Sequence, residues 1–202
     1  MLYLLLLPGP AVFAASDTTA TILVLGDSLS GAYGINPDEG WVALLQQQLL
    51  SEGYEYRVVN ASVSGDTTRT GLTRIHSALQ AHRPSIVILA LGGNDGLRGL
   101  PFSEIESSLA QIIERCRKDH VQVLLVGIRL PPNYGAEYNQ QFTAIYRQLS
   151  ERYDIPLVAR MLDQVAEYRE LLQDDGIHPK VAAQSRIMMN VWAGLLPMLE
   201  KH

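Results

Sequence analysis

The chain has 202 residues, of which 47% are hydrophobic and 18% charged, a composition typical of one globular domain and not of a disordered chain. Its formal net charge of −5 is spread without long acidic or basic runs. This argues against a nucleic-acid partner, because such binding normally leaves a basic stripe. The single cysteine, Cys116, excludes an intrachain disulfide.

The first residues have the pattern of a targeting segment. The apolar run Leu2–Leu7 is broken by two prolines and followed by the small residues of Ala11–Ala15. We therefore expect residues 1–15 to be a signal peptide, residues 16–202 to form a single domain, and the mature chain to be periplasmic or secreted. No Lys or Arg precedes the apolar run, so a frayed terminus is the alternative. No other run is long and apolar enough for a membrane helix.

Short β-branched runs then alternate with longer helical patterns. Two of these runs, Ile86–Leu89 and Val121–Val126, are nearly continuous in apolar residues, as in strands buried on both faces of a parallel sheet. The predicted strands are Thr21–Leu25, Tyr56–Asn60, Ser85–Leu91, Val121–Ile128 and Ile155–Val158. The predicted helices are Trp41–Leu50, Thr67–His82, Ser103–Lys118, Glu137–Tyr153 and Val181–Leu199.

Five alternations of strand and helix predict an α/β fold, a three-layer α/β/α sandwich with a five-stranded parallel sheet of the flavodoxin-like type. Right-handed crossovers would place the loops after the strands along one edge, where such sheets bind ligands. In the helix Ser103–Lys118, Ser103 and Glu106 are spaced for a capping box. Cys116 falls on its apolar face, as expected of an inert core thiol.

The first candidate site residue is Ser28, in the sequence Gly26-Asp27-Ser28 after the first predicted strand. A serine at such a turn has its hydroxyl at the open edge of the sheet, and the backbone N–H groups there can point at an anion. The alternative is that Ser28 caps the next helix.

The next two loops supply further candidates. Gly65 follows the second strand, and its N–H could approach a ligand closely. Taken alone, this segment is better explained as a plain turn with Asp66 capping the helix from Thr67. The third strand is followed by Gly92-Gly93-Asn94-Asp95. The Asn94 amide can donate to an oxyanion, or it can make only local turn hydrogen bonds.

A histidine near the C-terminus has a carboxylate three residues before it. Asp175 can accept a hydrogen bond from one ring nitrogen of His178, which leaves the other nitrogen free to take a proton from a serine. The other histidines lack such a setting. The sequence has no Gly-x-Gly-x-x-Gly, no P-loop and no Cys/His metal spacing, so we expect no cofactor and no metal.

Together these segments resemble the SGNH, or GDSL, hydrolase family, and most of all its exported bacterial multifunctional thioesterases, which also act as lysophospholipases and arylesterases. The resemblance covers nearly the whole chain from about Thr21. It rests on four blocks in the family's order: Gly26-Asp27-Ser28-Leu29-Ser30, Gly65, Gly92-Gly93-Asn94-Asp95 and Asp175-Gly176-Ile177-His178-Pro179.

The resemblance implies a serine hydrolase that cleaves carboxylic esters and thioesters of acyl chains, lysophospholipids included, through an acyl-enzyme on Ser28. His178 would be the base and Asp175 its orienting acid. The N–H groups of Ser28 and Gly65 and the Asn94 side chain would form the oxyanion hole.

We expect four apolar side chains to contact the substrate: Leu97 and Leu100 in the loop Gly96–Pro101, and Leu130 and Ile177 in segments similar to the subgroup. The enzyme is expected to act as a monomer on small molecules. Three other functions are compatible with the sequence. They are a carbohydrate O-deacetylase, an acyltransferase, and a non-catalytic binding module on a flavodoxin-like scaffold.

Overall fold

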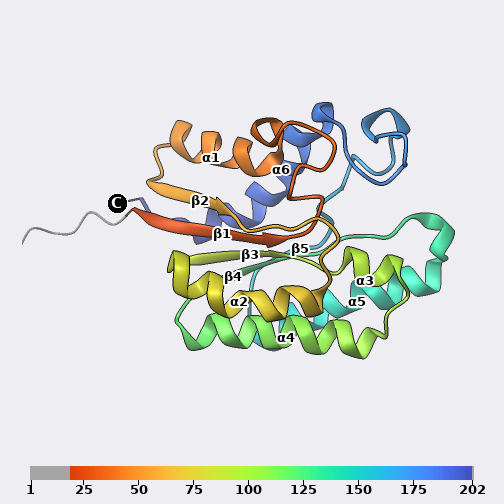
Figure 1. The fold of residues 1–202 in the computed structure, drawn as a ribbon, viewed down its shortest axis with the longest axis horizontal. Coiled ribbons are helices and arrows are strands. Elements are labelled where there is room, and N and C mark those ends of the chain that lie inside the picture. Colours follow the sequence, from red (N-terminus) through yellow and green to blue (C-terminus); the bar gives the residue numbers. More distant parts are fainter. Residues whose placement is uncertain (1–18, 202) are drawn as a thin grey trace, which may run out of the picture.

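The computed structural model describes residues 19–201 (Figure 1). The predicted signal peptide, residues 1–15, lies outside the described residues. The strands are β1 (Ala20–Gly26), β2 (Tyr56–Asn60), β3 (Ile86–Ala90), β4 (Gln122–Val126) and β5 (Leu157–Val158). The α-helices are α1 (Trp41–Ser51), α2 (Thr68–His82), α3 (Gly93–Leu97), α4 (Phe102–Lys118), α5 (Ala136–Tyr153) and α6 (Val181–Leu195). The 3-10 helices are η1 (Pro37–Glu39), η2 (Pro132–Tyr134), η3 (Arg169–Leu171) and η4 (Leu196–Met198).

The five strands form one parallel sheet in the order β2-β1-β3-β4-β5. Every residue of the central strand β3 is buried, which explains its continuous apolar sequence. This strand order is that of flavodoxin-like folds, in which ligands bind where the order reverses, here between β1 and β3. The predicted α/β fold with five parallel strands is therefore confirmed.

Helices cover both faces of the sheet, with α1 and α6 on one side and α2, α4 and α5 on the other (Figure 1). Because neighbouring side chains of a strand point to opposite faces, each strand contributes to two cores. Ile88 belongs to the same core as Trp41 of α1 and Ile187 of α6, whereas Leu89 belongs to the core that contains Ile75 of α2 and Phe142 of α5. Cys116 lies in the second core with no exposed surface, as predicted.

Two predicted helix caps are wrong. The helix α2 begins at Thr68, and the cap is Thr67, which forms a capping box with Thr70. Asp66 instead pairs its carboxylate with Arg74, the seventh residue of the helix. The second error concerns α4, which begins at Phe102 after Pro101, before the predicted cap Ser103. Its N-terminus has no side-chain cap.

The predicted capping partner Glu106 pairs with Arg152 of α5, a residue far away in the sequence. The C-terminal helix also ends earlier than predicted. Regular α-helix stops at Leu195, and η4 follows, because Pro197 has no N–H to continue the α-helical ladder. Among residues 19–201, no helix combines the length and apolar character that crossing a bilayer requires.

The chain at Ser28 does not form a strand-to-helix junction. Turns continue from Ser28 to Gly34, and the first α-helix begins only at Trp41, with Gly40 as its cap. The interpretation of Ser28 as a helix cap is therefore wrong. The helix α3 has no counterpart among the predicted helices. Gly93–Leu97 forms one helical turn directly after β3, so part of the expected loop at Gly96–Pro101 is helical.

Candidate active site

Three side chains form a hydrogen-bonded row at the carboxyl edge of the sheet. The Ser28 Oγ, just after β1, lies 2.9 Å from the His178 Nε2. The His178 Nδ1 lies 2.7 Å from the Asp175 Oδ2, and both residues belong to the loop between η3 and α6. The structure thus brings together Ser28 and His178, which are 150 positions apart in the chain, in the geometry of a nucleophile, a base and an orienting acid.

The Asp175 carboxylate is held in its charged form by the loop around it. It accepts hydrogen bonds from the His178 ring, from the His178 N–H at 3.0 Å and from the Ile177 N–H at 2.9 Å. These bonds, with the ring of His178 as the largest cause, lower the pKa of Asp175 to about 2. The group is therefore ionised at neutral pH and can stabilise a positive charge on the imidazole.

The loop that carries His178 is fastened to the turn after β1. The Gln173 side chain donates to the Tyr33 carbonyl at 2.8 Å and to the Pro179 carbonyl at 3.1 Å. The Tyr33 ring lies against the His178 imidazole, with 4.4 Å between the ring centroids. Gln173 and Tyr33 were not predicted to be near the site, because 140 residues separate them in the sequence.

The two backbone N–H groups that we expect to bind an oxyanion, those of Ser28 and Gly65, are free to donate a hydrogen bond to a ligand. Within residues 19–201, neither the Ser28 N–H nor the Gly65 N–H donates a hydrogen bond to another residue. Gly65 has a φ of +85°, a left-handed conformation that favours glycine. Space is not the reason for a glycine here, since an added Cβ would meet only the end of Arg98, at 3.9 Å.

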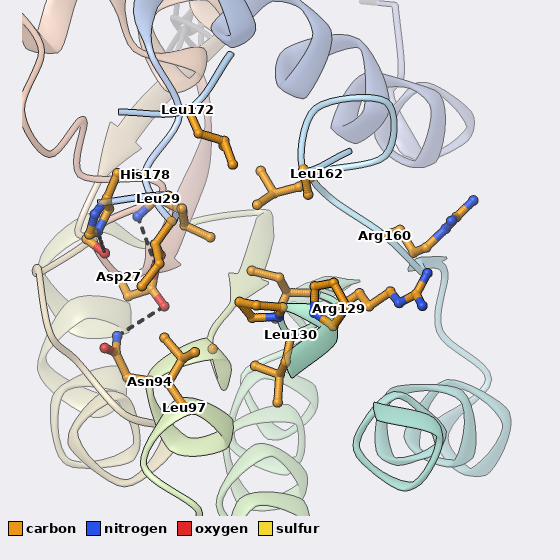
Figure 2. A pocket seen from close by; sticks show the side chains of 18 of the residues that line it. Asp27, Leu29, Asn94, Leu97, Arg129, Leu130, Arg160, Leu162, Leu172 and His178 are labelled. Carbon is orange, nitrogen blue, oxygen red and sulfur yellow. Dashed lines mark hydrogen bonds between the residues drawn. The ribbon is translucent and has the colours of Figure 1, made fainter. Parts of the chain in front are cut away.

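The Asn94 side chain joins this group from the first turn of α3. Its Nδ2 donates to the Asp66 carbonyl at 2.9 Å and, over a longer 3.3 Å, to the Asp27 carboxylate (Figure 2). Only the second of these bonds is long enough to be given up easily to another acceptor. The arrangement shows a connection between Asn94 and Asp27 that the sequence analysis did not predict.

Asp27 is a buried carboxylate beside Ser28, with 4% of its surface exposed. It accepts from the Leu29 N–H at 3.0 Å and from Asn94. Burial raises the pKa of Asp27 to about 6, against the lowering effects of the Leu29 hydrogen bond and of His178. Its position inside the Gly-Asp-Ser block was a signal of its importance, but burial was not evident from the sequence.

The loops of Gly65 and Asn94 are fastened to each other by a second buried carboxylate. Asp95 accepts from the Thr68 N–H at 2.9 Å and from the Thr68 hydroxyl at 2.6 Å. Gly92 allows the turn into α3, because its φ is +118° and an added Cβ would lie 2.2 Å from the Tyr146 hydroxyl. These contacts fix the position of Asn94 relative to Gly65.

A cavity of about 410 Å³, here called the site cavity, opens beside Ser28 and His178 (Figure 2). Of the four predicted substrate contacts, Leu97, Leu130 and Ile177 line it. Leu100 does not line it, because α3 ends at Leu97 and the chain turns at Gly99, where φ is +66°, before reaching Leu100. Further lining residues that the sequence analysis missed are Leu29, Ile128, Leu162, Leu172, Arg129 and Arg160.

The wall of the site cavity is largely apolar, as is usual for sites that bind small organic molecules. Leu162 and Leu172 come from the part of the chain between β5 and the Asp175–His178 loop, where no sequence pattern indicated a site. Among the described residues, no three His, Cys, Asp or Glu side chains gather as possible metal ligands.

Comparisons with known proteins agree with this geometry. Residues 24–186 match the model of the GDSL-like lipase/acylhydrolase family. The chain is 46% identical to a Pseudomonas aeruginosa protein named esterase TesA, over 89% of each chain. It is 44% identical to the Escherichia coli protein named thioesterase 1/protease 1/lysophospholipase L1, over 85% of this chain and 79% of that one.

A solved crystal structure of TesA superposes with a TM-score of 0.87 at 46% sequence identity, and the match covers 89% of this chain and 99% of that one. The fold and these matches define an ester-hydrolysing serine hydrolase. More closely, the chain belongs to the GDSL-like lipase/acylhydrolase family.

Proposed function

We propose that the chain hydrolyses esters and thioesters of acyl chains, including acyl-CoA, lysophospholipids and aryl esters, through an acyl-enzyme on Ser28. The observation that carries the proposal is the row from Ser28 to His178 at 2.9 Å and from His178 to Asp175 at 2.7 Å. It supplies a hydroxyl, a base that reaches it, and an acid that orients the base.

Ser28 attacks the acyl carbonyl carbon while the His178 Nε2 takes the hydroxyl proton. His178 returns that proton to the leaving oxygen or sulfur, and Asp175 stabilises the imidazolium between the two steps. The N–H groups of Ser28 and Gly65 and the amide of Asn94 bind the oxygen that becomes negative. Water, activated by His178, then attacks the acyl-enzyme and releases the fatty acid.

The site cavity supports acyl chains as substrates. A volume of about 410 Å³ is far more than an acetyl group needs, and leucines line it. Each methylene that enters contributes about 0.8 kcal/mol, without a strict geometric requirement. Broad tolerance of chain length follows from this.

Hydrolysis of p-nitrophenyl esters and acyl-CoAs from C2 to C16, with Ser28→Ala as the control, tests the proposal. We expect activity on medium and long chains and its near-complete loss in Ser28→Ala. Activity on acetyl esters alone would support a carbohydrate O-deacetylase, and wild-type activity in Ser28→Ala would exclude Ser28 as the nucleophile.

We also propose that the protein is exported to the periplasm or the medium after removal of residues 1–15, and that it acts there as a monomer without a cofactor. The support is the apolar N-terminal pattern of the sequence. Mass spectrometry of the protein in the periplasmic fraction should give an N-terminus at Ser16. An uncleaved chain found only in the cytoplasm would contradict export, and light scattering measures the mass in solution.

A further inference from the structure

A second cavity, of about 350 Å³, lies against α5 beyond the carboxyl ends of β4 and β5. We call it the arginine cavity, because Arg129, Arg147 and Arg160 all line it. Its other polar lining side chains are Asn139, Gln140, Thr143 and Tyr146, which are uncharged. No Asp or Glu of the described residues lines the arginine cavity, so its wall is strongly cationic.

Two of these arginines are not neutralised by the protein. Arg160 pairs with Asp163 at 2.6 Å. Arg129 and Arg147 make neither an ion pair nor a side-chain hydrogen bond with any of residues 19–201. A cluster of this kind is unexpected in a chain whose net charge is −5.

The arginine cavity adjoins the site cavity, since Arg129 and Arg160 line both. Figure 2 places these two side chains at the end of the site cavity that is away from His178 and Asn94. A molecule with its reacting carbonyl at Ser28 and its apolar part among the leucines therefore has its remote end directed toward the arginines.

The guanidinium groups indicate what that end carries. Arg presents its N–H donors in a rigid fork that matches a carboxylate or phosphate, and charge-assisted bonds of this type are stronger than neutral ones. An anion among three arginines would also relieve their mutual repulsion. We propose that the arginine cavity binds an anionic group, carboxylate or phosphate, at the remote end of the part of the substrate that lies along the site cavity.

The inference rests on the proposed function, and two kinds of substrate supply the chemistry. One is an acyl chain that lies along the site cavity and ends in a second carboxylate. The other is a leaving group that lies there in place of the acyl chain and carries phosphates. The first is tested with the p-nitrophenyl monoester of a dicarboxylic acid against the p-nitrophenyl alkanoate of equal length. The second is tested with hexanoyl-CoA against the S-hexanoyl thioester of N-acetylcysteamine, which has no phosphate.

The variant for both pairs is Arg147→Gln, because Arg147 is exposed on α5 and lines only the arginine cavity. The ratio of kcat/KM for the anionic substrate to that for its neutral partner should fall about tenfold in at least one pair. Arg83→Gln is the matched control and should keep the wild-type ratio. It removes an arginine between α2 and the start of β3, at the edge of the sheet opposite to the cavities and in the lining of neither.

A fall in the dicarboxylate pair assigns the cavity to a carboxylate, and a fall in the coenzyme A pair assigns it to a phosphate. An unchanged ratio in both pairs overturns the inference.

Titration calorimetry with inorganic pyrophosphate tests the cavity without catalysis. It therefore separates this inference from the proposed function if no ester is cleaved. Wild-type protein should bind pyrophosphate, and Arg147→Gln should bind it about tenfold more weakly. Equal binding by both, or no binding by either, would contradict the proposal.

Discussion

The Asn94 amide nitrogen lies 3.3 Å from a carboxylate oxygen of Asp27, the residue directly before Ser28. Its other hydrogen bond, 2.9 Å long, goes to the Asp66 carbonyl in the loop of Gly65. One side chain therefore links the three loops that follow β1, β2 and β3. An amide held in this way needs little reorganisation to bind a developing negative charge, and such preorganised donors contribute strongly to catalysis.

Replacing Asn94 by alanine should lower kcat about 10²–10³-fold with little effect on KM, because the donor acts mainly in the transition state. Steady-state kinetics on a p-nitrophenyl ester measures this. Asn94→Asp, which keeps the size but has no side-chain N–H to donate, should be at least as impaired. A change confined to KM would instead make Asn94 a residue that binds the ground state of the substrate.

Asp27 should make the stability of the protein depend on pH. Its pKa is raised from 3.8 to about 6, so its contribution to folding is fully present below pH 3.8 and is lost as the pH rises through 6. Keeping the charged form buried costs on the order of 3 kcal/mol. Asp27→Asn should therefore become more stable relative to the wild type by up to about this amount between pH 4 and pH 7.

Urea unfolding at several pH values measures that difference. Absolute stability is a poorer readout, because the amide introduced by Asp27→Asn would face the Asn94 amide. Asp38→Asn, at an exposed carboxylate of η1, controls for the removal of one negative charge. A difference in stability that does not change between pH 4 and pH 7 would show that folding does not raise the pKa of Asp27.

Asp175→Asn should lower kcat by about 10⁴-fold while leaving the fold intact, because the amide can favour the wrong tautomer of His178. The size of this effect is taken from the serine protease triad. Circular dichroism confirms the fold, and kinetics gives the loss. A loss below tenfold would mean that Asp175 only anchors its loop.

The pH dependence of Asp175 has the opposite sign to that of Asp27. Its pKa is lowered to about 2, so its contribution to stability is present above pH 3.8 and is lost as the pH falls toward 2. The difference in unfolding free energy between wild type and Asp175→Asn should not shrink from pH 7 to about pH 4.5 and should shrink only below that. Shrinkage already at pH 6 would contradict the lowered pKa.

Gly96→Ala should destabilise the protein by about 1–3 kcal/mol through overpacking. An added Cβ would lie 2.8 Å from Leu130 and 2.9 Å from Phe142, both buried. Gly93→Ala in the same helical turn is the matched control, because its Cβ would meet its nearest neighbour, Asp27, at an ordinary 3.5 Å. Thermal unfolding compares the two variants, and equal melting temperatures would show that the Leu130 side chain moves aside freely.

The amino-acid sequence by itself determined the class of fold. Parallel strands that are buried on both faces need continuous apolar runs, and β3 and β4 have them. Such a strand can therefore be recognised from a few consecutive residues. Ser28, Gly65, Asn94 and His178 each follow a strand or precede a helix, so their meeting at one edge was expected from the rule that parallel strands share their carboxyl ends. The order of these blocks also indicated the family.

What only the tertiary structure decided depends on neighbours that are distant in the sequence. Ser103 has the local pattern of a cap, but its partner Glu106 pairs across helices with Arg152. Asp27 acquires its raised pKa only through burial, which no local pattern encodes. The arginine cavity gathers Arg147 from α5 and Arg129 and Arg160 from the loops after β4 and β5. Desolvation and charge clustering are set by packing in space, and a linear sequence shows neither.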